Sequence, residues 1–297
     1  MFAQTSALMQ YFVYLLAYPL LWCISRLPFP LLYLVSDVVF VLLYYVIGYR
    51  KKTVRGNLKL AFPDWSEKER LVIERKSYRH LCDMFLEMIK TLSISEKEIK
   101  KRFQFTNIET YQALERENKS VAMMVAHYAS YEWAISMNYY VNFKGYAIYK
   151  RIANPYFDKL VHDIRSRFQA YLITTKDTIP MIHENEKAGI RGVYGFASDQ
   201  SPKASRAYHW GSFMNATTPV HTGAEMLSKK FDMNVIFLKV KKVKRGHYEA
   251  TFEVLSTDVK NVPDYQITDE FLKRVEQQIN EAPEFYLWTH KRWKHVK

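Results

Sequence analysis

The stretch VAMMVAHYASYEW, residues 121–133, places two side chains that could work together as acid and base. His127 follows six apolar residues, and Glu132 is the only carboxylate in the stretch. A carboxylate beside an imidazole fixes its tautomer and raises its basicity, which makes the imidazole a competent general base. Taken alone, a histidine and a glutamate at this spacing form a weak motif, because such a pair is more often incidental.

The two side chains converge only in one kind of local structure. Residues five apart on a regular α-helix differ by about 140°, so on a single helix His127 and Glu132 would not share a face. They can meet if His127 ends a strand and Glu132 lies in the first turn of the following helix, with Ser130 near its cap. The apolar run before His127 predicts this strand–turn–helix arrangement.

Beyond residue 50, strand-like apolar runs alternate with helical patterns. A Ser66–Glu69 capping box opens a helix predicted over residues 66–90, and further helices are predicted over residues 155–169, 219–231 and 268–281. Strands are predicted in VAMMVA, YAIYK, GVYGFA, NVIFLKV and YEATFEVL, the last two joined by the KRGHY turn. The pattern predicts an α/β fold with a mostly parallel central sheet flanked by helices and an antiparallel edge at that turn.

Polar side chains follow two more of these predicted strands. GVYGFA leads into Ser198 and Asp199, and YAIYK leads into a segment with three arginines, Arg151, Arg165 and Arg167. Each stretch also has a simpler explanation. The first could be an Asx turn before proline, and the second could be a solvated helix face. Sites in such sheets form at the carboxyl ends of strands, so three polar strand ends together predict a functional site.

The first 49 residues carry only Arg26 and Asp37 as charged side chains. Residues 1–24 and 31–48 are two apolar runs, each just able to cross a hydrocarbon core of about 30 Å. Asp37 would cost roughly 2.5–3.5 kcal/mol at mid-membrane unless it is paired or its helix lies shallow. No basic n-region precedes the first apolar run, which argues against a signal peptide. The alternative to membrane attachment is a helical hairpin buried in the protein. We expect residues 1–49 to form a membrane anchor of one or two embedded helices, ahead of a main domain over residues 50–297.

The formal net charge of +13 implies an anionic partner, such as nucleic acid, an anionic membrane surface or an acidic protein. The cations that follow the second apolar run should lie on the cytoplasmic side; they are Arg50, Lys51, Lys52 and Arg55. Two other clusters are either solvated surface or docking sites for anionic headgroups or an acidic protein. They are Lys239, Lys241, Lys242, Lys244 and Arg245 near the turn, and Lys291, Arg292, Lys294 and Lys297 in the tail. Trp288 and Trp293 of the tail are expected at the membrane–water level.

The cysteines and the absence of several known motifs make some catalytic mechanisms and metal sites less favoured for this sequence. Cys23 and Cys82 form no disulfide framework, which suits a reducing compartment. Cys23 lies in an apolar run and the sequence has no GxSxG elbow, so a covalent acyl-enzyme is disfavoured. P-loop, GxGxxG and HExxH motifs are absent as well, and His290 and His295 belong more naturally to the terminal aromatic and basic segment than to a metal site.

Several segments, taken in chain order, resemble the late (secondary) acyltransferases of lipid A biosynthesis. This lauroyl/myristoyl acyltransferase family belongs to the wider lysophospholipid acyltransferase superfamily. The segments are NLKLAFPDWSEKER, SYRHLCDMFLEMIK, AHYASYEW, YKRIANPYFDKLVHDIRSRF, ASDQSPK, FMNATTPVHTGAEMLSKKF and INEAPEFYLWTHKRWKH. The resemblance covers nearly the whole chain. The DQSP and WGSFMNATTP stretches look most like Bacteroidetes-type members, which weakens any transfer of acceptor identity from the enterobacterial enzymes.

The resemblance implies an inner-membrane enzyme, active at the cytoplasmic face, with residues 50–297 as the acyltransferase domain. It would move a fatty acyl chain from acyl carrier protein to a hydroxyl of a membrane lipid, such as the acyl chain of a lipid A precursor, without a metal or organic cofactor. His127 would deprotonate the hydroxyl, with Glu132 orienting the histidine. The substrate-binding candidates are Arg165 for a phosphate or the oxyanion, Arg167 as second choice, Asp199 as support, and Arg151.

The chemistry of the residues agrees with this reaction, because attack on a thioester needs a base and an oxyanion donor but no protein nucleophile. Two alternatives stay open. One is an acyltransferase of the same superfamily that acts on a lysophospholipid or on an ornithine or glycine aminolipid. The other is a non-catalytic membrane module that binds anionic lipid or nucleic acid. Such a module would not need a His–Glu pair and an aspartate at strand ends, so nucleic acid is not the expected partner.

Overall fold

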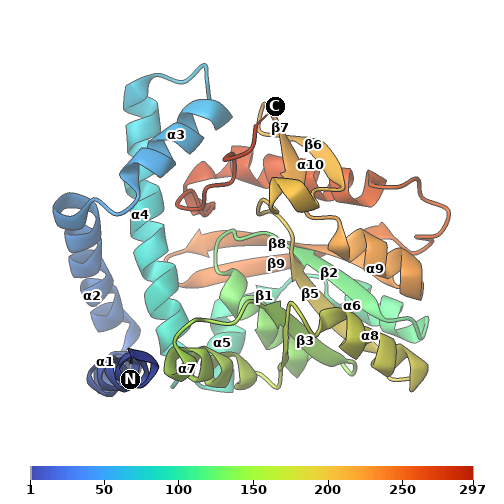
Figure 1. Cartoon of the computed structure of the whole chain (residues 1–297), viewed down its shortest axis with the longest axis horizontal. Coiled ribbons are helices and arrows are strands. Elements are labelled where there is room, and N and C mark those ends of the chain that lie inside the picture. Colours follow the sequence, from blue (N-terminus) through green and yellow to red (C-terminus); the bar gives the residue numbers. More distant parts are fainter. Residues whose placement is uncertain (1, 297) are drawn as a thin grey trace.

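A computed structural model describes residues 2–296 of the chain, with side chains from residue 8 onwards. Its centre is a seven-stranded sheet in the order β1-β9-β8-β2-β5-β3-β4 (Figure 1). The strands are β1 (Phe103–Phe105), β2 (Val121–Val125), β3 (Lys144–Tyr149), β4 (Tyr171–Thr174), β5 (Gly192–Ala197), β8 (Asn234–Lys244) and β9 (His247–Ser256). Neighbours pair in parallel, except β8 and β9, which form an antiparallel hairpin. The predicted α/β fold with a mostly parallel sheet is confirmed, and so is its hairpin.

The central strands are continuous apolar runs because they are covered on both faces. The first four residues of β2 are all buried. Val121 pairs with Val193 of β5 on one side and with Asn234 of β8 on the other. Parallel strands with two covered faces lack the polar alternation of half-exposed strands. For this reason β2 and β5 can be recognised in the sequence as uninterrupted apolar runs.

Helices cover the sheet and stand across its strand ends. They are α3 (Lys51–Ala61), α4 (Glu67–Lys90), α5 (Glu96–Arg102), α6 (Ile108–Arg116), α7 (Pro155–Ser166), α8 (Thr178–Lys187), α9 (Gly223–Phe231) and α10 (Gln266–Glu281), with 3₁₀ turns η2 (Tyr131–Tyr139), η3 (Ala204–Arg206) and η4 (Pro283–Phe285). The capping box of α4 is confirmed: the Glu69 amide donates to the Ser66 hydroxyl, and the Ser66 amide donates to the Glu69 carboxylate at 2.7 Å. In Figure 1, α4 stands between the sheet and the N-terminal helices.

Some elements differ from the prediction or were not anticipated. The helix predicted over residues 219–231 begins only at Gly223, because Pro219 and Val220 end a strand, β7 (Ala216–Val220). This strand pairs with β6 (His209–Phe213) in a separate two-stranded sheet. Strands β1 and β4 span three and four residues, too short for alternation to become visible. Helices α3, α5, α6 and α8 were also not predicted.

The N-terminal residues form two long apolar helices. They are α1 (Phe2–Arg26) and α2 (Phe29–Val41), and α2 continues as a π-helical segment, η1 (Leu42–Ile47). By length and composition, Leu8–Arg26 and Phe29–Ile47 could each cross a membrane. Neither helix stands free of the main domain: α2 packs against α4, and Lys90 of α4 donates to the backbone oxygens of Ser25 and Leu27 at 2.7 and 2.8 Å.

Three of the five hairpin cations are engaged in ion pairs within the protein. Lys239 pairs with Glu281 at 2.7 Å, Lys242 with Asp83 at 3.4 Å, and Arg245 with Asp83 at 2.7 Å and with Asp37 at 2.8 Å. Lys241 and Lys244 stay exposed, with no ion pair to any residue that the structure describes. The hairpin therefore binds the main domain to α2. Its Arg245 is the cation that pairs with Asp37, the one carboxylate of that apolar helix.

We expect Arg245→Met to lower the free energy of unfolding by roughly 1–3 kcal/mol, since it removes the main charge partner of a buried carboxylate. Asp83 is only 5% exposed and would keep Lys242 and Ser36 as partners. Thermal unfolding of the purified protein in detergent measures the change. Lys241→Met, in the same hairpin, is the control and should stay within about 0.5 kcal/mol. Equal stability of both variants would contradict a structural role for Arg245.

Candidate active site

Adjacent parallel strands deliver His127 and Asp199 to the same place. Val125, the last residue of β2, is in register with Ala197, the last residue of β5. Two residues beyond each strand end, the Nδ1 atom of His127 and the Oδ1 atom of Asp199 are 2.7 Å apart. The backbone N–H of His127 donates to the same oxygen at 3.1 Å. The register of the sheet therefore creates the pair.

The hydrogen bond to Asp199 decides which nitrogen of His127 faces outward. The pKa of Asp199 lies below its ordinary value, and an ionised carboxylate can only accept, so the Nδ1–H of His127 donates. The Nε2 atom then keeps a lone pair, as a general base requires. Burial lowers the pKa of His127, but Asp199, followed by Glu132, outweighs burial and leaves the pKa above its ordinary value. Burial raises the pKa of Asp199, while the charge and hydrogen bonds of His127 bring it below the ordinary value.

Glu132 lies near His127, but it is not the carboxylate that holds the imidazole. Ser130 is the N-cap residue of η2, as predicted, and Glu132 falls in the first turn of η2. The direction of that turn brings Glu132 to α7, where Arg165 donates from Nε at 2.8 Å and from Nη2 at 2.6 Å. The expectation that Glu132 orients the histidine is therefore corrected, since Asp199 makes that contact. Glu132 instead fixes the guanidinium of Arg165 in a two-point fork.

The other predicted arginines lie apart from this centre. Arg167 donates to the backbone oxygens of Leu92 at 2.9 Å and Ile94 at 3.1 Å, so its guanidinium joins two segments of the domain. These bonds use two of the five N–H groups of the guanidinium, and a substrate-binding role for Arg167 stays a prediction. Arg151 is exposed beyond the end of β3.

The C-terminal tail closes one side of the site. Tyr128 and Tyr286 form an antiparallel bridge, Leu287 N–H donates to the His127 oxygen at 3.1 Å, and Ala129 N–H donates to the Phe285 oxygen at 2.9 Å. Ala129 has a φ of 49°, a left-handed conformation that costs a non-glycine residue of order 1 kcal/mol or more. The tail thus holds a strained turn directly after the candidate base.

Helix α3 holds the tail in turn, through an asparagine that sequence reasoning did not single out. The side-chain amide of Asn57 donates to the backbone oxygens of Trp288 at 2.8 Å and of His290 at 2.7 Å. Asn57 belongs to the NLKLAFPDW segment, and only its buried position in the fold reveals this contact. Burial lowers the pKa of His290 to about 4, so this imidazole stays neutral.

The aromatic and basic residues of the tail are mostly interior, contrary to expectation. Trp288 and Trp293 are buried and stack with ring centroids 5.8 Å apart, so they do not lie at a membrane–water boundary. Arg292 is also buried and donates to the Pro219 oxygen at 3.2 Å. Lys291 and Lys294 remain exposed, while Lys297 lies outside the described residues.

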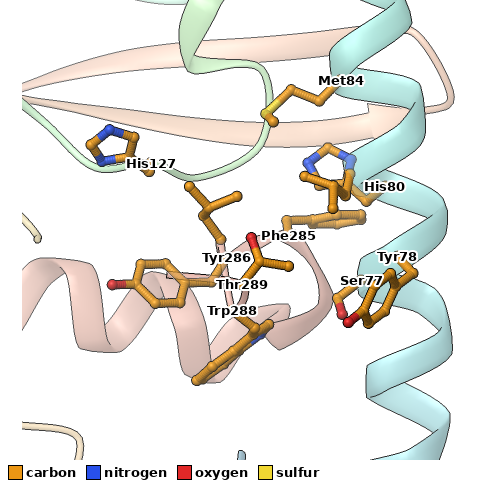
Figure 2. Close-up of a pocket in the computed structure, with 11 residues that line it drawn as sticks. Ser77, Tyr78, His80, Met84, His127, Phe285, Tyr286, Trp288 and Thr289 are labelled. Atoms are coloured by element: carbon orange, nitrogen blue, oxygen red, sulfur yellow. The ribbon is translucent and has the colours of Figure 1, made fainter. Parts of the chain in front are cut away.

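A narrow pocket opens between α4, the His127 turn and the tail (Figure 2). Its lining is mostly apolar and aromatic, and it includes two imidazoles, His127 and His80. The cavity volume of about 10 Å³ fits one water-sized group, so the pocket is an inner recess of the site and not a channel for an acyl chain. Sequence reasoning missed His80, although it lies in the SYRHLCDMFLEMIK segment that carries the resemblance. Among the described residues, no group of His, Cys, Asp or Glu side chains could hold a metal ion.

Residues 1–295 match the model of the bacterial lipid A biosynthesis acyltransferase family. The chain is 22% identical to a lipid A biosynthesis lauroyltransferase of Escherichia coli, over 96% of this chain and 92% of that protein. It is 24% identical to a lipid A biosynthesis acyltransferase of Haemophilus influenzae, over 82% and 76%. A lipid A biosynthesis myristoyltransferase of Escherichia coli is 25% identical over 55% of this chain, and the match spans half of that relative's length.

The hydrogen bond to Asp199 should be visible in the titration of His127. In protein with ¹³C-labelled histidines, we expect the His127 ring signal to titrate above the ordinary histidine pKa of about 6.5. Asp199→Asn should move that titration to lower pH, because the variant removes the charge that stabilises the imidazolium. The spectrum of His127→Gln assigns the signal among the nine histidines. An unchanged titration in Asp199→Asn would contradict the pairing.

Proposed function

This chain belongs to the bacterial lipid A biosynthesis acyltransferase family, and on that premise we propose that it transfers a fatty acyl chain from acyl carrier protein to a hydroxyl of a lipid A precursor. The observation that carries the proposal is the His127–Asp199 pair, built by the register of β2 and β5. An outward-facing imidazole nitrogen with a buried carboxylate behind it is suited to removing a proton from a hydroxyl.

The proposed reaction needs no nucleophile from the protein. His127 Nε2 takes the proton of the acceptor hydroxyl as its oxygen attacks the thioester carbonyl carbon. The resulting tetrahedral oxyanion then collapses: the new carbon–oxygen bond remains, the carbon–sulfur bond breaks, and the thiolate takes the proton from the His127 imidazolium. Asp199 stabilises that imidazolium through the 2.7 Å bond while the proton is held.

Arg165 is placed to contribute charge to this reaction. Its Nε and Nη2 atoms are used by Glu132, which leaves Nη1 as the donor for a phosphate or for the oxyanion. Glu132 then acts as a positioning residue, because it fixes the guanidinium and keeps a charge near His127. This role replaces the one expected for Glu132 from the sequence.

Attachment to the inner membrane, with the catalytic domain on the cytoplasmic face, is part of the proposal. Residues 1–49 serve as the anchor and residues 50–297 as the acyltransferase domain. The apolar surface of α1 and α2 supports attachment, with Leu16 80% and Val46 72% exposed. A lipid acceptor requires a site within reach of the bilayer, and α4 links the site pocket to α2. The cations of α3 follow α2 directly, as the positive-inside rule requires of a cytoplasmic segment.

A different acceptor remains the second candidate, since another hydroxyl-bearing membrane lipid would need the same base. Lysophospholipid and ornithine or glycine aminolipids fall in this class. A binding module without activity is less well supported, because headgroup or nucleic-acid binding does not require an imidazole held by a buried carboxylate. Lipid profiles of a strain that lacks this gene distinguish these acceptors.

The activity test uses the full-length protein in detergent with acyl-acyl carrier protein and a lipid A precursor. His127→Ala and Asp199→Asn should each lower the rate about 10²–10⁴-fold, because general-base catalysis is worth that much. Glu132→Ala should also lose activity, by freeing Arg165. Lys241→Ala, on the exposed hairpin surface, is the control. Near wild-type turnover in His127→Ala would refute the mechanism.

The donor test uses two exposed lysines of the tail, Lys291 and Lys294, which follow the segment that lines the site pocket. An acidic carrier protein is steered by such charges, so the double substitution to glutamate should impair transfer from acyl carrier protein more than from acyl-coenzyme A. The matched control is the double substitution to glutamate at Lys241 and Lys244. Equal losses with both donors in the tail variant would argue against carrier-protein docking there.

A further inference from the structure

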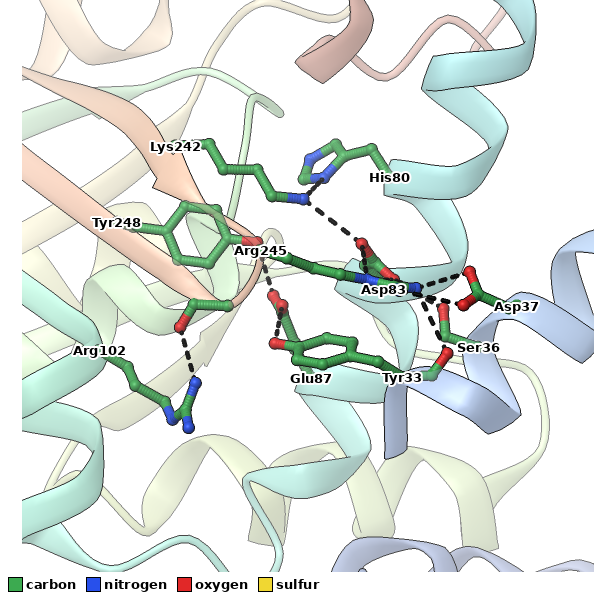
Figure 3. Close-up of polar contacts among 11 residues, drawn as sticks. Tyr33, Ser36, Asp37, His80, Asp83, Glu87, Arg102, Lys242, Arg245 and Tyr248 are labelled. Atoms are coloured by element: carbon green, nitrogen blue, oxygen red, sulfur yellow. Dashed lines mark hydrogen bonds and ion pairs between the residues drawn. The ribbon is translucent and has the colours of Figure 1, made fainter. Parts of the chain in front are cut away.

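A polar network connects the apolar helix α2 to the inner recess of the candidate site (Figure 3). On its α2 side, Ser36 donates to Asp83 at 2.8 Å and Tyr33 donates to Glu87 at 2.8 Å. On its hairpin side, Tyr248 donates to Glu87 at 2.8 Å. Burial raises the pKa of Glu87 to about 7. The network crosses α4, and its last member toward the site is a histidine.

Lys242 determines the tautomer of that histidine, His80. The Lys242 ammonium lies 3.3 Å from His80 Nδ1 and 3.4 Å from Asp83 Oδ2. An ammonium group can only donate, so Nδ1 must accept and, in the neutral ring, Nε2 carries the hydrogen. His80 is 5% exposed, and Nε2 has no hydrogen-bond partner among the residues that the structure describes. A buried N–H donor without a hydrogen-bond partner of ordinary geometry therefore belongs to a ring that lines the recess.

The charges around His80 keep its ring neutral. Burial first and the Lys242 charge second hold the pKa of His80 well below its ordinary value, against a weaker opposing effect of the Ala129 carbonyl. The aromatic ring of Phe285 packs against the imidazole with ring centroids 4.9 Å apart. A neutral imidazole is an effective hydrogen-bond donor to a carbonyl oxygen that gains negative charge.

The two imidazoles of the recess have opposite hydrogen-bonding roles. His127 presents an acceptor nitrogen, because Asp199 takes its N–H. His80 presents a donor nitrogen, because Lys242 occupies its acceptor. Both rings line one recess whose other walls are largely apolar (Figure 2). An ester-forming reaction needs this combination, since a hydroxyl must lose a proton while a carbonyl oxygen gains charge.

We propose that His80 is a second catalytic residue, whose Nε2–H donates to the thioester carbonyl oxygen and stabilises the oxyanion, with Lys242 as the positioning residue that fixes its tautomer. This role rests on the proposed acyl transfer and deepens it. Arg165 shares the task only in part, because two of its nitrogens already bind Glu132. The proposal also assigns a purpose to a buried polar atom that otherwise lacks a partner.

The test compares His80→Phe with His80→Gln in the full-length enzyme, with acyl-acyl carrier protein as donor and a lipid A precursor as acceptor. Phenylalanine keeps the ring shape without the donor, and we expect kcat to fall about 10²–10³-fold at an unchanged KM. Glutamine restores an N–H near the position of Nε2 and should recover part of the loss. Cys82→Ala, at a neighbouring buried position of α4 outside the recess, should keep kcat within about threefold of wild type.

The His127 titration separates a donor role from a merely structural one. If His80 only supported the turn after His127, His80→Phe would displace that titration or lower the thermal midpoint along with kcat. We expect both to stay at their wild-type values. A kcat within about threefold of wild type in His80→Phe, no recovery in His80→Gln, or a displaced His127 titration would each overturn the proposal. An inactive wild-type protein would refute the proposed function, and this role with it.

Discussion

The buried carboxylate of Asp199 imposes the requirement that organises the site. A charge that is 1% exposed costs several kcal/mol to remove from water unless donors surround it. One of its oxygens receives both the ring and the backbone N–H of His127. These donors arrive together only because β2 and β5 are parallel neighbours with Val125 opposite Ala197. A register slip of one residue would turn the strand's side chains to the opposite face and leave the carboxylate unpaired.

The turn that carries His127 depends on residues that are far away in the sequence. Its backbone is bonded to Phe285 and Leu287, and the tail that follows is bonded to Asn57. The strained backbone conformation of Ala129 is maintained because these hydrogen bonds hold the turn in place. The candidate base, His127, is therefore held in this position only when α3 and the C-terminal tail are both folded against the domain.

The sequence predicts those parts of the molecule whose patterns are local. The apolar runs of β2 and β5, the capping box of α4 and the KRGHY hairpin each depend on a few neighbouring residues, and each is present. His127 and Asp199 were identified because polar residues at strand ends meet in a parallel sheet. The partner of Glu132 was not, because the direction of a 3₁₀ turn and the placement of α7 are tertiary properties. The same holds for His80, whose helical pattern gives no sign that its imidazole lines the recess. It also holds for Trp288 and Trp293, whose aromatic character suits a core as well as a membrane boundary.

Opposite electrostatic environments give the two histidines of the recess different proton affinities. Asp199 and Glu132 place negative charge near His127, which raises its pKa despite burial. His80 has Lys242 at its Nδ1, so burial and a positive charge both lower its pKa. When environments separate the pKa values of two groups in one site, the groups can serve as base and as neutral donor at the same pH. Lys242 pairs with Asp83, the carboxylate that also binds Arg245 of the same hairpin, and its positive charge adds to the burial that keeps His80 neutral.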